Sequence, residues 1–267
     1  MAITSYLYQI LITLKKKELT SSGKTNSIFE IGEQNWYGDV SFQDLMKTID
    51  NYSDSKNKEV LNKKLKEIIT LTEIGKNPKS FSFDVAKLFY KTIFDYKEYL
   101  ALDLQGTKHS ISFDLNNEYK DVKRYDVVTN IGTSEHIFNQ LAVFKTIHNS
   151  VASGGLIIHQ LPGQGYYDHG FYNYQPTFFF DLAQANNYLM IGFWMYDNNK
   201  KELISIHNRE NYAKLFGRKN HPTYYDNIVI YKSSDKKEEE FKLPTQHIYS
   251  KTSLSSEEQK RWNAIKK

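Results

Sequence analysis

The sequence predicts an α/β fold in which a mostly parallel sheet of seven strands carries helices on both faces. The main evidence is the segment 125–162, whose pattern is that of a buried strand, a helix and a second buried strand. Ser134 is expected to cap this helix, apolar residues then recur at helical spacing, and Gly154-Gly155 is expected to end it. A crossover of this kind joins parallel strands, so the sheet is predicted to be parallel here.

Short apolar runs predict the remaining strands, and amphipathic segments predict helices between them. Ser41 stands at the start of one helical pattern, and Pro176 suits the first turn of another. The apolar N-terminal run before Lys15 is expected to pack on the domain as a helix or a strand. Beside the two crossover strands, the expected strands are 27–31, 99–104, 109–115, 188–196 and 227–231, and the expected helices include 83–96.

The length of the chain and the absence of a linker predict a single domain over 1–267. A content of 40% hydrophobic and 15% aromatic residues suffices for a large core. Within this domain we expect a helical insertion over 51–96, because one strand–helix–strand step needs only about 30 residues. The insertion either forms a cap on the substrate side or only lengthens the domain. A charged C-terminal tail is expected over 234–267.

Composition limits the class of protein. The net charge is +4 and the lysines alternate with acidic residues. The sequence therefore lacks the basic stripe that would predict nucleic-acid binding. The absence of cysteine excludes disulfides, thiolate catalysis and thiolate zinc sites. No apolar segment approaches the roughly 20 residues of a membrane span, and the N-terminal lysines follow the apolar run, unlike those of a signal peptide. We therefore expect a cytoplasmic protein, and a homodimer is left open.

Polar side chains follow several of the predicted strands. Glu30, Gly32 and Gln34 form an E-x-G-x-Q turn after one strand, Asp103 ends the next, and Asp114 follows the third. Carboxyl ends of parallel strands meet at one edge of the sheet, where α/β proteins bind ligands. A glycine there lets a ligand approach the backbone, and an acid can accept hydrogen bonds from a ribose. Taken singly, each feature also fits a plain turn glycine or a solvated acid.

Taken in order, these segments resemble the class I S-adenosylmethionine-dependent methyltransferases, in particular a bacterial subgroup whose first motif is E-x-G-x-Q. The motifs that carry the resemblance are ALDLQG (101–106), FDLNN (113–117), DVVTNIGTSEH (126–136) and GGLIIHQLPGQGYYDHGFYNYQPTFFF (154–180). Glu33 and Gln34 stand where most relatives have a second glycine. The resemblance implies a single methyltransferase-like domain with a Rossmann-like fold and S-adenosylmethionine as cofactor. It also implies cofactor contacts from Glu30, Gly32, Gln34, Asp103, Asp114, Asn130 and Gly132.

Two histidines follow the crossover strands and are candidates for proton transfer. His169 is the first candidate for a general base, with Asp168 or Glu135 to orient it, because an imidazole titrates near neutral pH. His136 is the second candidate. A metal held by the two histidines and nearby acids is the weaker alternative. No ligand spacing here is diagnostic, so no metal site is predicted.

Aromatic residues crowd the loop between the second crossover strand and the next helix. Buried tyrosines need hydrogen-bond partners, so packing alone seldom requires so many of them in one loop. An aromatic wall with polar tips suits a sugar, a nucleotide or another amphipathic small molecule, and packing against the following helix is the alternative. The residues are Tyr166, Tyr167, Phe171, Tyr172 and Tyr174.

The sequence thus predicts an enzyme that transfers a methyl group from S-adenosylmethionine to oxygen or nitrogen of a small-molecule or carbohydrate acceptor. A non-catalytic binding domain of the same fold is the first alternative. A nicotinamide-dependent oxidoreductase is disfavoured, because GEQNWYG lacks the G-x-G-x-x-G turn. A nucleic-acid methyltransferase is disfavoured because the basic charge is dispersed.

Overall fold

An eight-stranded sheet forms the centre of the structure, a computed structural model that describes residues 2–19, 27–76, 80–120, 123–216, 220–234 and 240–249. Its strands are β2 (Ser27–Ile31), β4 (Glu98–Leu102), β5 (Ser110–Ile111), β6 (Tyr125–Ile131), β7 (Val151–Gln164), β8 (Leu189–Asp197), β9 (Glu202–Ser205) and β10 (Tyr225–Lys232). Their order is β5-β4-β2-β6-β7-β10-β8-β9. The pairs from β5 to β7 are parallel, and the pairs β7–β10, β10–β8 and β8–β9 are antiparallel. A separate parallel pair joins β1 (Ala2–Ile3) to β3 (Asn35–Trp36).

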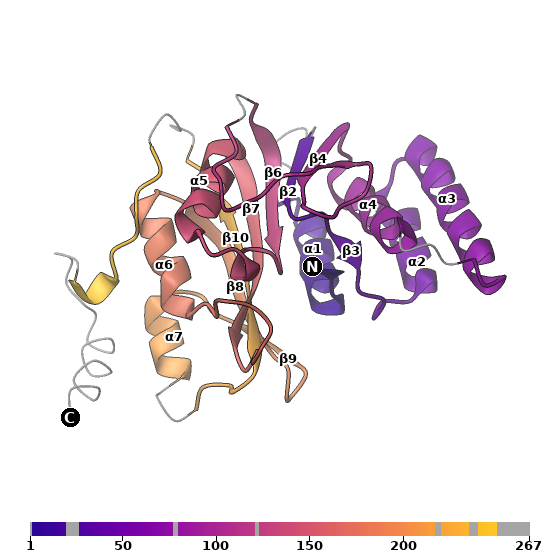
Figure 1. The fold of residues 1–267 in the computed structure, drawn as a ribbon. Coiled ribbons are helices and arrows are strands. Elements are labelled where there is room, and N and C mark those ends of the chain that lie inside the picture. Colours follow the sequence, from indigo (N-terminus) through magenta and orange to yellow (C-terminus); the bar gives the residue numbers. More distant parts are fainter. Residues whose placement is uncertain are drawn as a thin grey trace.

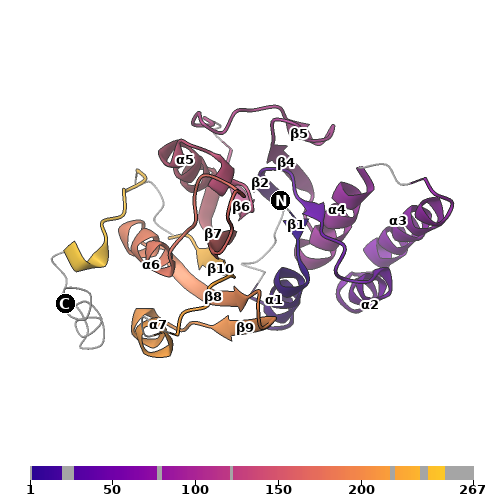
Figure 2. The same ribbon diagram turned by 60° about the horizontal axis from the view of Figure 1, so that its bottom comes forward.

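Two sets of helices cover the two faces of this sheet, as Figure 1 and Figure 2 show. One set is α1 (Ser5–Lys16), α2 (Phe42–Tyr52), α3 (Ser55–Glu73) and α4 (Ser80–Phe94), and the other is α5 (Gln140–Ser150), α6 (Pro176–Ala185) and α7 (Arg209–Leu215). Ile28 packs in the core beneath α1–α4, whereas its neighbour Phe29 packs in the core beneath α5–α7. Consecutive strand residues point to opposite faces, so each central strand contributes to both cores.

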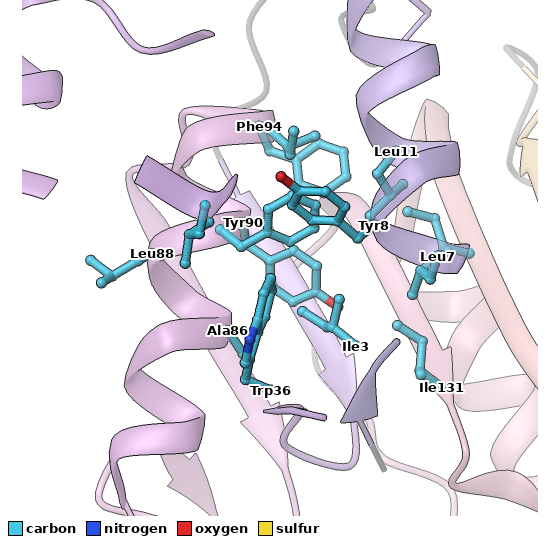
Figure 3. Packing of buried hydrophobic residues seen from close by; sticks show 14 of the residues in the cluster. Ile3, Leu7, Tyr8, Leu11, Trp36, Ala86, Leu88, Tyr90, Phe94 and Ile131 are labelled. Carbon is cyan, nitrogen blue, oxygen red and sulfur yellow. The ribbon is translucent and has the colours of Figure 1, made fainter. Parts of the chain in front are cut away.

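The core beneath α1–α4 is rich in aromatic side chains. Tyr8 of α1 packs against Phe89 of α4 with 5.0 Å between ring centroids, and Trp36 meets Phe89 edge to face at 5.6 Å. Figure 3 shows Leu7 and Leu11 of α1 facing this group. Large aromatic side chains dominate the energetics of a core, so this packing anchors α1 to the domain. The apolar N-terminal run is therefore a helix, one of the two forms that the sequence allowed.

The strand order reverses between β2 and β6, which are parallel neighbours in the sheet. From β2 the sheet extends one way to β4 and β5, while β6 and β7 lie on its other side. A switch point of this kind opens a crevice at the carboxyl ends of the two strands. Gly32 (φ 77°) and Gly132 (φ 60°) stand in the turns that leave these ends, where a left-handed backbone favours glycine.

The predicted fold class is confirmed, but the sheet has eight strands rather than seven. The additional strand is β9, a short edge strand that pairs with β8. The predicted strand 109–115 is reduced to the two residues of β5, which pair with Ala101 and Leu102 of β4.

The predicted start of the crossover helix is wrong by about one and a half turns. α5 begins at Gln140, and Asn139 caps it by accepting a hydrogen bond from the Ala142 amide at 3.3 Å. Ser134 instead lies in a short 3-10 turn, Ser134–His136. Asn130 accepts a hydrogen bond from the Ser134 amide and donates one to its hydroxyl, so the polar groups that would have capped a helix hold a loop.

The predicted end of that helix is also wrong. α5 ends at Ser150, β7 begins at Val151, and Gly154-Gly155 lies inside the strand. The pairing of β7 with β6 shifts register here, and Gly154 has a φ of 70°. The glycines thus permit an irregularity in a strand rather than terminating a helix.

The residues between β2 and β4 form three helices. α4 packs on the sheet directly before β4, so α4 is the crossover helix of this step. Leu61, Leu65 and Ile68 of α3 are buried against the same core, and α3 lies at the periphery in Figure 1. α3 and α4 border a lysine-lined groove of about 790 Å³. That this insertion acts as a cap stays a prediction. Among the described residues, no helix has the length and apolar character that a membrane span requires.

Candidate active site

Glu30, Gly32 and Gln34 fold into a closed turn at the end of β2. Glu30 is buried, and its Oε2 accepts hydrogen bonds from the Gln34 amide at 3.0 Å and from the Tyr99 hydroxyl. Burial raises the pKa of Glu30 to about 7. Gln34 is also buried; its Nε2 donates to the Gly32 carbonyl at 2.8 Å, and its Oε1 has no hydrogen-bond partner among the described residues. Glu30 therefore holds the turn, and the Gln34 side chain folds back onto it.

Glu33 ties this turn to two other elements. Its carboxylate pairs with Lys87 of α4 and accepts hydrogen bonds from the amide and the hydroxyl of Thr107, which follows β4. Burial raises the pKa of the Glu33 carboxyl, but the hydrogen bonds from Lys87 and Thr107 outweigh burial and hold this pKa below its usual value. The Glu33 side chain therefore points into the scaffold.

Asp103 occupies the carboxyl end of β4 and is half-buried. Its Oδ2 accepts the Glu33 amide at 3.0 Å and its Oδ1 accepts the Gln105 amide at 2.8 Å. Each carboxylate oxygen can accept a further hydrogen bond, so Asp103 can still bind a ribose hydroxyl. Together with the glycine turns at Gly32 and Gly132, this carboxylate fits an adenosyl cofactor at the switch point.

Asp114 and Asn130, two further residues predicted to bind the cofactor, form hydrogen bonds that hold local turns of the backbone. Asp114 is exposed, and its Oδ1 accepts hydrogen bonds from the amide and the side chain of Asn116. Asn130 is fully buried and bonds Ser134 and His159. Asn130 is thus placed to position the loop that carries Glu135 rather than to face a ligand.

A cavity of about 520 Å³ lies at the same edge of the sheet, beside Gly132. Its walls come from the start of α1, the turn after β6, the end of β7 with its following loop, the end of β8 and the start of β10. The polar and aromatic residues that line it include Thr4, Tyr6, Glu135, Gln160, Tyr166, Tyr167, His169, Tyr196, Asn198 and Asp226. The size and the mixed lining suit a small polar ligand.

Glu135 and His169 line this cavity, and His136 lies beside both of them. Its Oε1 lies 3.8 Å from His136 Nε2 and 3.7 Å from His169 Nε2, and the two rings are 5.0 Å apart. Glu135 is 1% exposed, and neither of its carboxylate oxygens has a hydrogen-bond partner among the described residues. Burial raises the pKa of Glu135 to about 7. A buried carboxylate without partners is costly, so this group is the least satisfied part of the site.

The loop that carries His169 is clamped onto Glu135. The Glu135 carbonyl accepts hydrogen bonds from the amides of Phe171 at 2.7 Å and Tyr172 at 3.2 Å. A Cβ on Gly170 would lie 2.9 Å from that carbonyl oxygen, so only glycine permits this approach. The backbone of Asp168 adopts a φ of 56° directly before His169. The side chain of Asp168 is exposed and does not line the cavity.

Two of the five aromatic residues predicted to contact the acceptor line the cavity. Tyr166 donates a hydrogen bond to Asp226, and its ring centroid lies 5.3 Å from that of His169. Tyr167 is largely exposed at the cavity mouth. Tyr166 and Tyr167 are therefore the part of the predicted aromatic wall that the structure brings to the site.

The other three aromatic residues of the loop pack outside the cavity. Tyr174 is buried and donates a hydrogen bond to the Ser134 hydroxyl at 2.9 Å. Tyr172 donates to the Phe138 carbonyl at 2.9 Å, and Phe171 packs edge to face on the Phe138 ring. These contacts hold the loop against the turn that precedes α5.

Asp226 and its partners Tyr6 and Asn198 are site residues that the sequence analysis did not predict, whereas the third partner, Tyr166, was predicted. Asp226 Oδ2 accepts hydrogen bonds from the hydroxyls of Tyr6, at 3.0 Å, and Tyr166, and from Asn198 Nδ2 at 2.9 Å. Burial raises the pKa of Asp226. Gln160 joins this network by donating to the Tyr6 hydroxyl at 3.2 Å. No sequence pattern indicated this network, because it depends on the antiparallel pairing of β10 with β7, which brings the start of β10 to the edge where the parallel strands end.

Solved structures that resemble this chain include methyltransferases, although the likeness is distant. A 1,6-didemethyltoxoflavin-N1-methyltransferase from Burkholderia thailandensis is similar, with a TM-score of 0.45, 8% identity, and coverage of 85% of this chain and 78% of that one. The N-methyltransferase NodS from Bradyrhizobium japonicum gives a TM-score of 0.43, 9% identity, and coverage of 86% and 95%. Similarities this distant assign neither a ligand nor an acceptor. No curated protein sequence matches the chain.

The fold and the geometry at its switch point define a Rossmann-like α/β protein with a cavity at the carboxyl edge of its sheet. A family described as a methyltransferase domain matches residues 67–220, which is more than half of the 267 residues. The chain belongs to this methyltransferase domain family. The predictions of the enzyme class and of S-adenosylmethionine as its cofactor are confirmed at the level of the family.

Proposed function

We propose that the protein transfers the methyl group of S-adenosylmethionine to an oxygen or nitrogen atom of a small polar acceptor, a class that includes carbohydrates. The observation that carries the proposal is the position of Glu135. Its buried carboxylate, without hydrogen-bond partners among the described residues, lines a cavity beside the Gly132 turn together with His169, and the His136 ring lies next to both. Groups of this kind bind and activate a polar acceptor.

The donor would be held at the switch point. Asp103 would accept hydrogen bonds from the ribose, and the turns at Gly32 and Gly132 would let the cofactor approach the backbone. When bound, the cofactor supplies a methyl group that its sulfonium charge already makes electrophilic. The remaining task of the protein is to align the acceptor and to take up its proton.

The acceptor would lie in the cavity of about 520 Å³. His169 presents Nε2 beside Glu135 and is the first candidate to receive the acceptor's proton, with His136 as the second. Asp226 is held by three donors, so it can orient hydroxyl groups of the acceptor. Tyr167 is 88% exposed at the cavity and offers an aromatic surface to a sugar ring.

The donor site is tested by thermal unfolding with S-adenosylhomocysteine, with NAD as the control ligand. Ligand at about 100 times its dissociation constant adds roughly 2.7 kcal/mol. For a domain of this size we expect the melting temperature to rise by about 5 °C or more. The rise should shrink in Asp103→Asn and persist in Glu202→Gln, which alters an exposed acid on β9.

A non-catalytic binding domain is the second candidate function. The observation in its favour concerns the turn after β2, where most methyltransferases of this class have a second glycine. Glu33 and Gln34 stand there instead, and both are fully buried. No shift with millimolar S-adenosylhomocysteine would support this candidate. A shift with NAD alone would instead contradict the proposed donor.

A further inference from the structure

A carboxylate and two imidazoles converge at the edge of the cavity, where Glu135 and His169 line the wall and His136 lies beside them. The ligand atoms of Glu135, His136 and His169 all lie within 4.8 Å of one another. Glu135 is almost completely buried, while the side chains of His136 and His169 are 42% and 46% exposed. We propose that Glu135, His136 and His169 bind a divalent transition-metal ion.

Electrostatics favours a cation at this point of the wall. The two oxygens of Glu135 are buried and accept no hydrogen bond among the described residues. An unpaired buried carboxylate is strongly unfavourable unless a cation or a donor compensates it. A metal ion between the carboxylate and the two Nε2 atoms would supply that compensation.

The spacing of the three ligands is close to that of a coordination sphere. A metal about 2.1 Å from each ligand places neighbouring ligand atoms about 3.0–3.5 Å apart. The separations from Glu135 Oε1 are 3.8 Å to His136 Nε2 and 3.7 Å to His169 Nε2. Small side-chain movements would therefore complete the coordination.

The backbone holds the two histidine loops together. Gly170 permits the close approach to the Glu135 carbonyl, and the amides of Phe171 and Tyr172 donate to it. On the other side, Asn130 fixes the Ser134 turn that precedes Glu135. The three ligands thus stand on loops whose spacing is set before a metal arrives, which favours binding.

The ligand chemistry selects the class of metal. Imidazole nitrogen suits Zn²⁺, Cu²⁺, Ni²⁺ and Fe²⁺, whereas Mg²⁺, Ca²⁺ and Mn²⁺ prefer sites made of oxygen atoms. Three protein ligands leave coordination positions free, and Glu135 and His169 line the cavity from which an acceptor would reach these positions. If the proposed function holds, on which this step rests, an oxygen atom of the acceptor takes one of these positions. An Nε2 atom bound to the metal has no lone pair left for a proton, so the metal would then take the place of a histidine base: it would lower the pKa of the bound oxygen, whose proton would pass to water.

The experiment is a Co²⁺ titration of the full chain, followed by visible absorption and by calorimetry. We expect one Co²⁺ per chain, and at least tenfold weaker binding in His136→Ala, His169→Ala and Glu135→Gln. His109→Ala, which removes an exposed histidine outside the cluster, should bind like the unmodified chain. Mg²⁺ should compete poorly and Zn²⁺ well. Equal binding by His109→Ala and His169→Ala, or no binding by the unmodified chain, would overturn the proposal.

The rise in melting temperature with S-adenosylhomocysteine tests the proposed function independently of the metal site. The same measurement shows whether each variant is folded. His136→Ala and His169→Ala should retain the shift, because the donor contacts come from Gly32, Gly132 and Asp103. Co²⁺ binding without any cofactor shift would support the metal site and contradict the proposed function. A cofactor shift without Co²⁺ binding would do the reverse.

Discussion

Glu30 is a buried carboxyl group whose protonation should affect stability. Its pKa is raised by burial from 4.5 to about 7 in the folded chain. Between pH 4.5 and pH 7, Glu30 therefore keeps its proton in the folded chain but loses it in the unfolded chain. The free energy of unfolding consequently falls as the pH rises through this range. Glu30→Gln removes this dependence, which amounts to about 3 kcal/mol. We expect urea unfolding at pH 5 and pH 8 to show a smaller loss in the variant; parallel pH profiles would contradict the assignment.

Variants of Tyr174 and Tyr167 should distinguish an aromatic residue that holds the loop from one that contacts the acceptor. The Tyr174 hydroxyl lies 2.9 Å from the Ser134 hydroxyl and 2.6 Å from Gln140 Oε1, and its one proton can be donated to either of them. Tyr174→Phe should therefore lower the free energy of unfolding by about 1–2 kcal/mol. Tyr167→Ala should leave stability nearly unchanged and raise KM for the acceptor. Urea unfolding and steady-state kinetics of both variants test this pair. A large effect of Tyr174→Phe on KM, at full stability, would return Tyr174 to the acceptor site.

At the residue scale, the reactive side chains were predictable but their environment was not. Glu135 and His136 are adjacent in the sequence, and His169 was recognised as chemically suitable. Their meeting depends on Gly170 and on a backbone clamp that no local pattern reveals. The role of Asn130 was equally hidden, because its partners lie on a turn and on a neighbouring strand.

At the element scale, Lys87 connects α4 to the turn after β2. The Lys87–Glu33 pair is 12% and 0% exposed, so removing the lysine charge leaves a buried carboxylate without its counter-ion. Lys87→Met should lower the free energy of unfolding by about 3 kcal/mol. The double variant Glu33→Gln/Lys87→Met should lose less, and Lys63→Met, on the exposed side of α3, should change little. Urea unfolding of these chains and of Glu33→Gln measures the coupling, and additive losses would show that the two residues do not interact.

Element types were predictable because apolar periodicity reports which face is buried. Element ends were less predictable, since they depend on competing hydrogen bonds. Ser134 has the chemistry of a helix cap, yet Asn130 engages it and Asn139 caps α5 instead. Gly154 has the chemistry of a helix stop, yet it lies in β7, where only the pairing with β6 explains its conformation.

At the scale of the whole molecule, we expect the chain to unfold as a single unit. The core beneath α1–α4 joins these helices to β2, β6, β7 and β10, so the insertion shares its core with the sheet. Trp36 lies in this core. In the variant Trp194→Phe/Trp262→Phe, its fluorescence should change at the same urea concentration as the circular dichroism of the whole chain. An earlier fluorescence transition would show that the insertion unfolds as a separate domain.

The order of the strands and the composition of the cavity were the parts least accessible to sequence reasoning. The crossover pattern predicts parallel neighbours, but only the assembled sheet brings the start of α1 and the start of β10 to the edge where β6 and β7 end. Tyr6 and Asp226 lie 220 positions apart in the sequence and share a hydrogen bond in the cavity wall.

The position of the first residues has a practical consequence for anyone who purifies this protein. Ala2 and Thr4 line the cavity, whereas the segment 240–249 lies over α5 and α6, where Lys242 bonds Asn186. Figure 1 shows these two parts of the chain on opposite sides of the sheet. An affinity tag joined to the N-terminus would begin at the mouth of the cavity and would compete with ligands for that space. A tag at the other end of the chain follows the segment 240–249, which lies away from the cavity, so ligand screens should use that arrangement or cleave an N-terminal tag first.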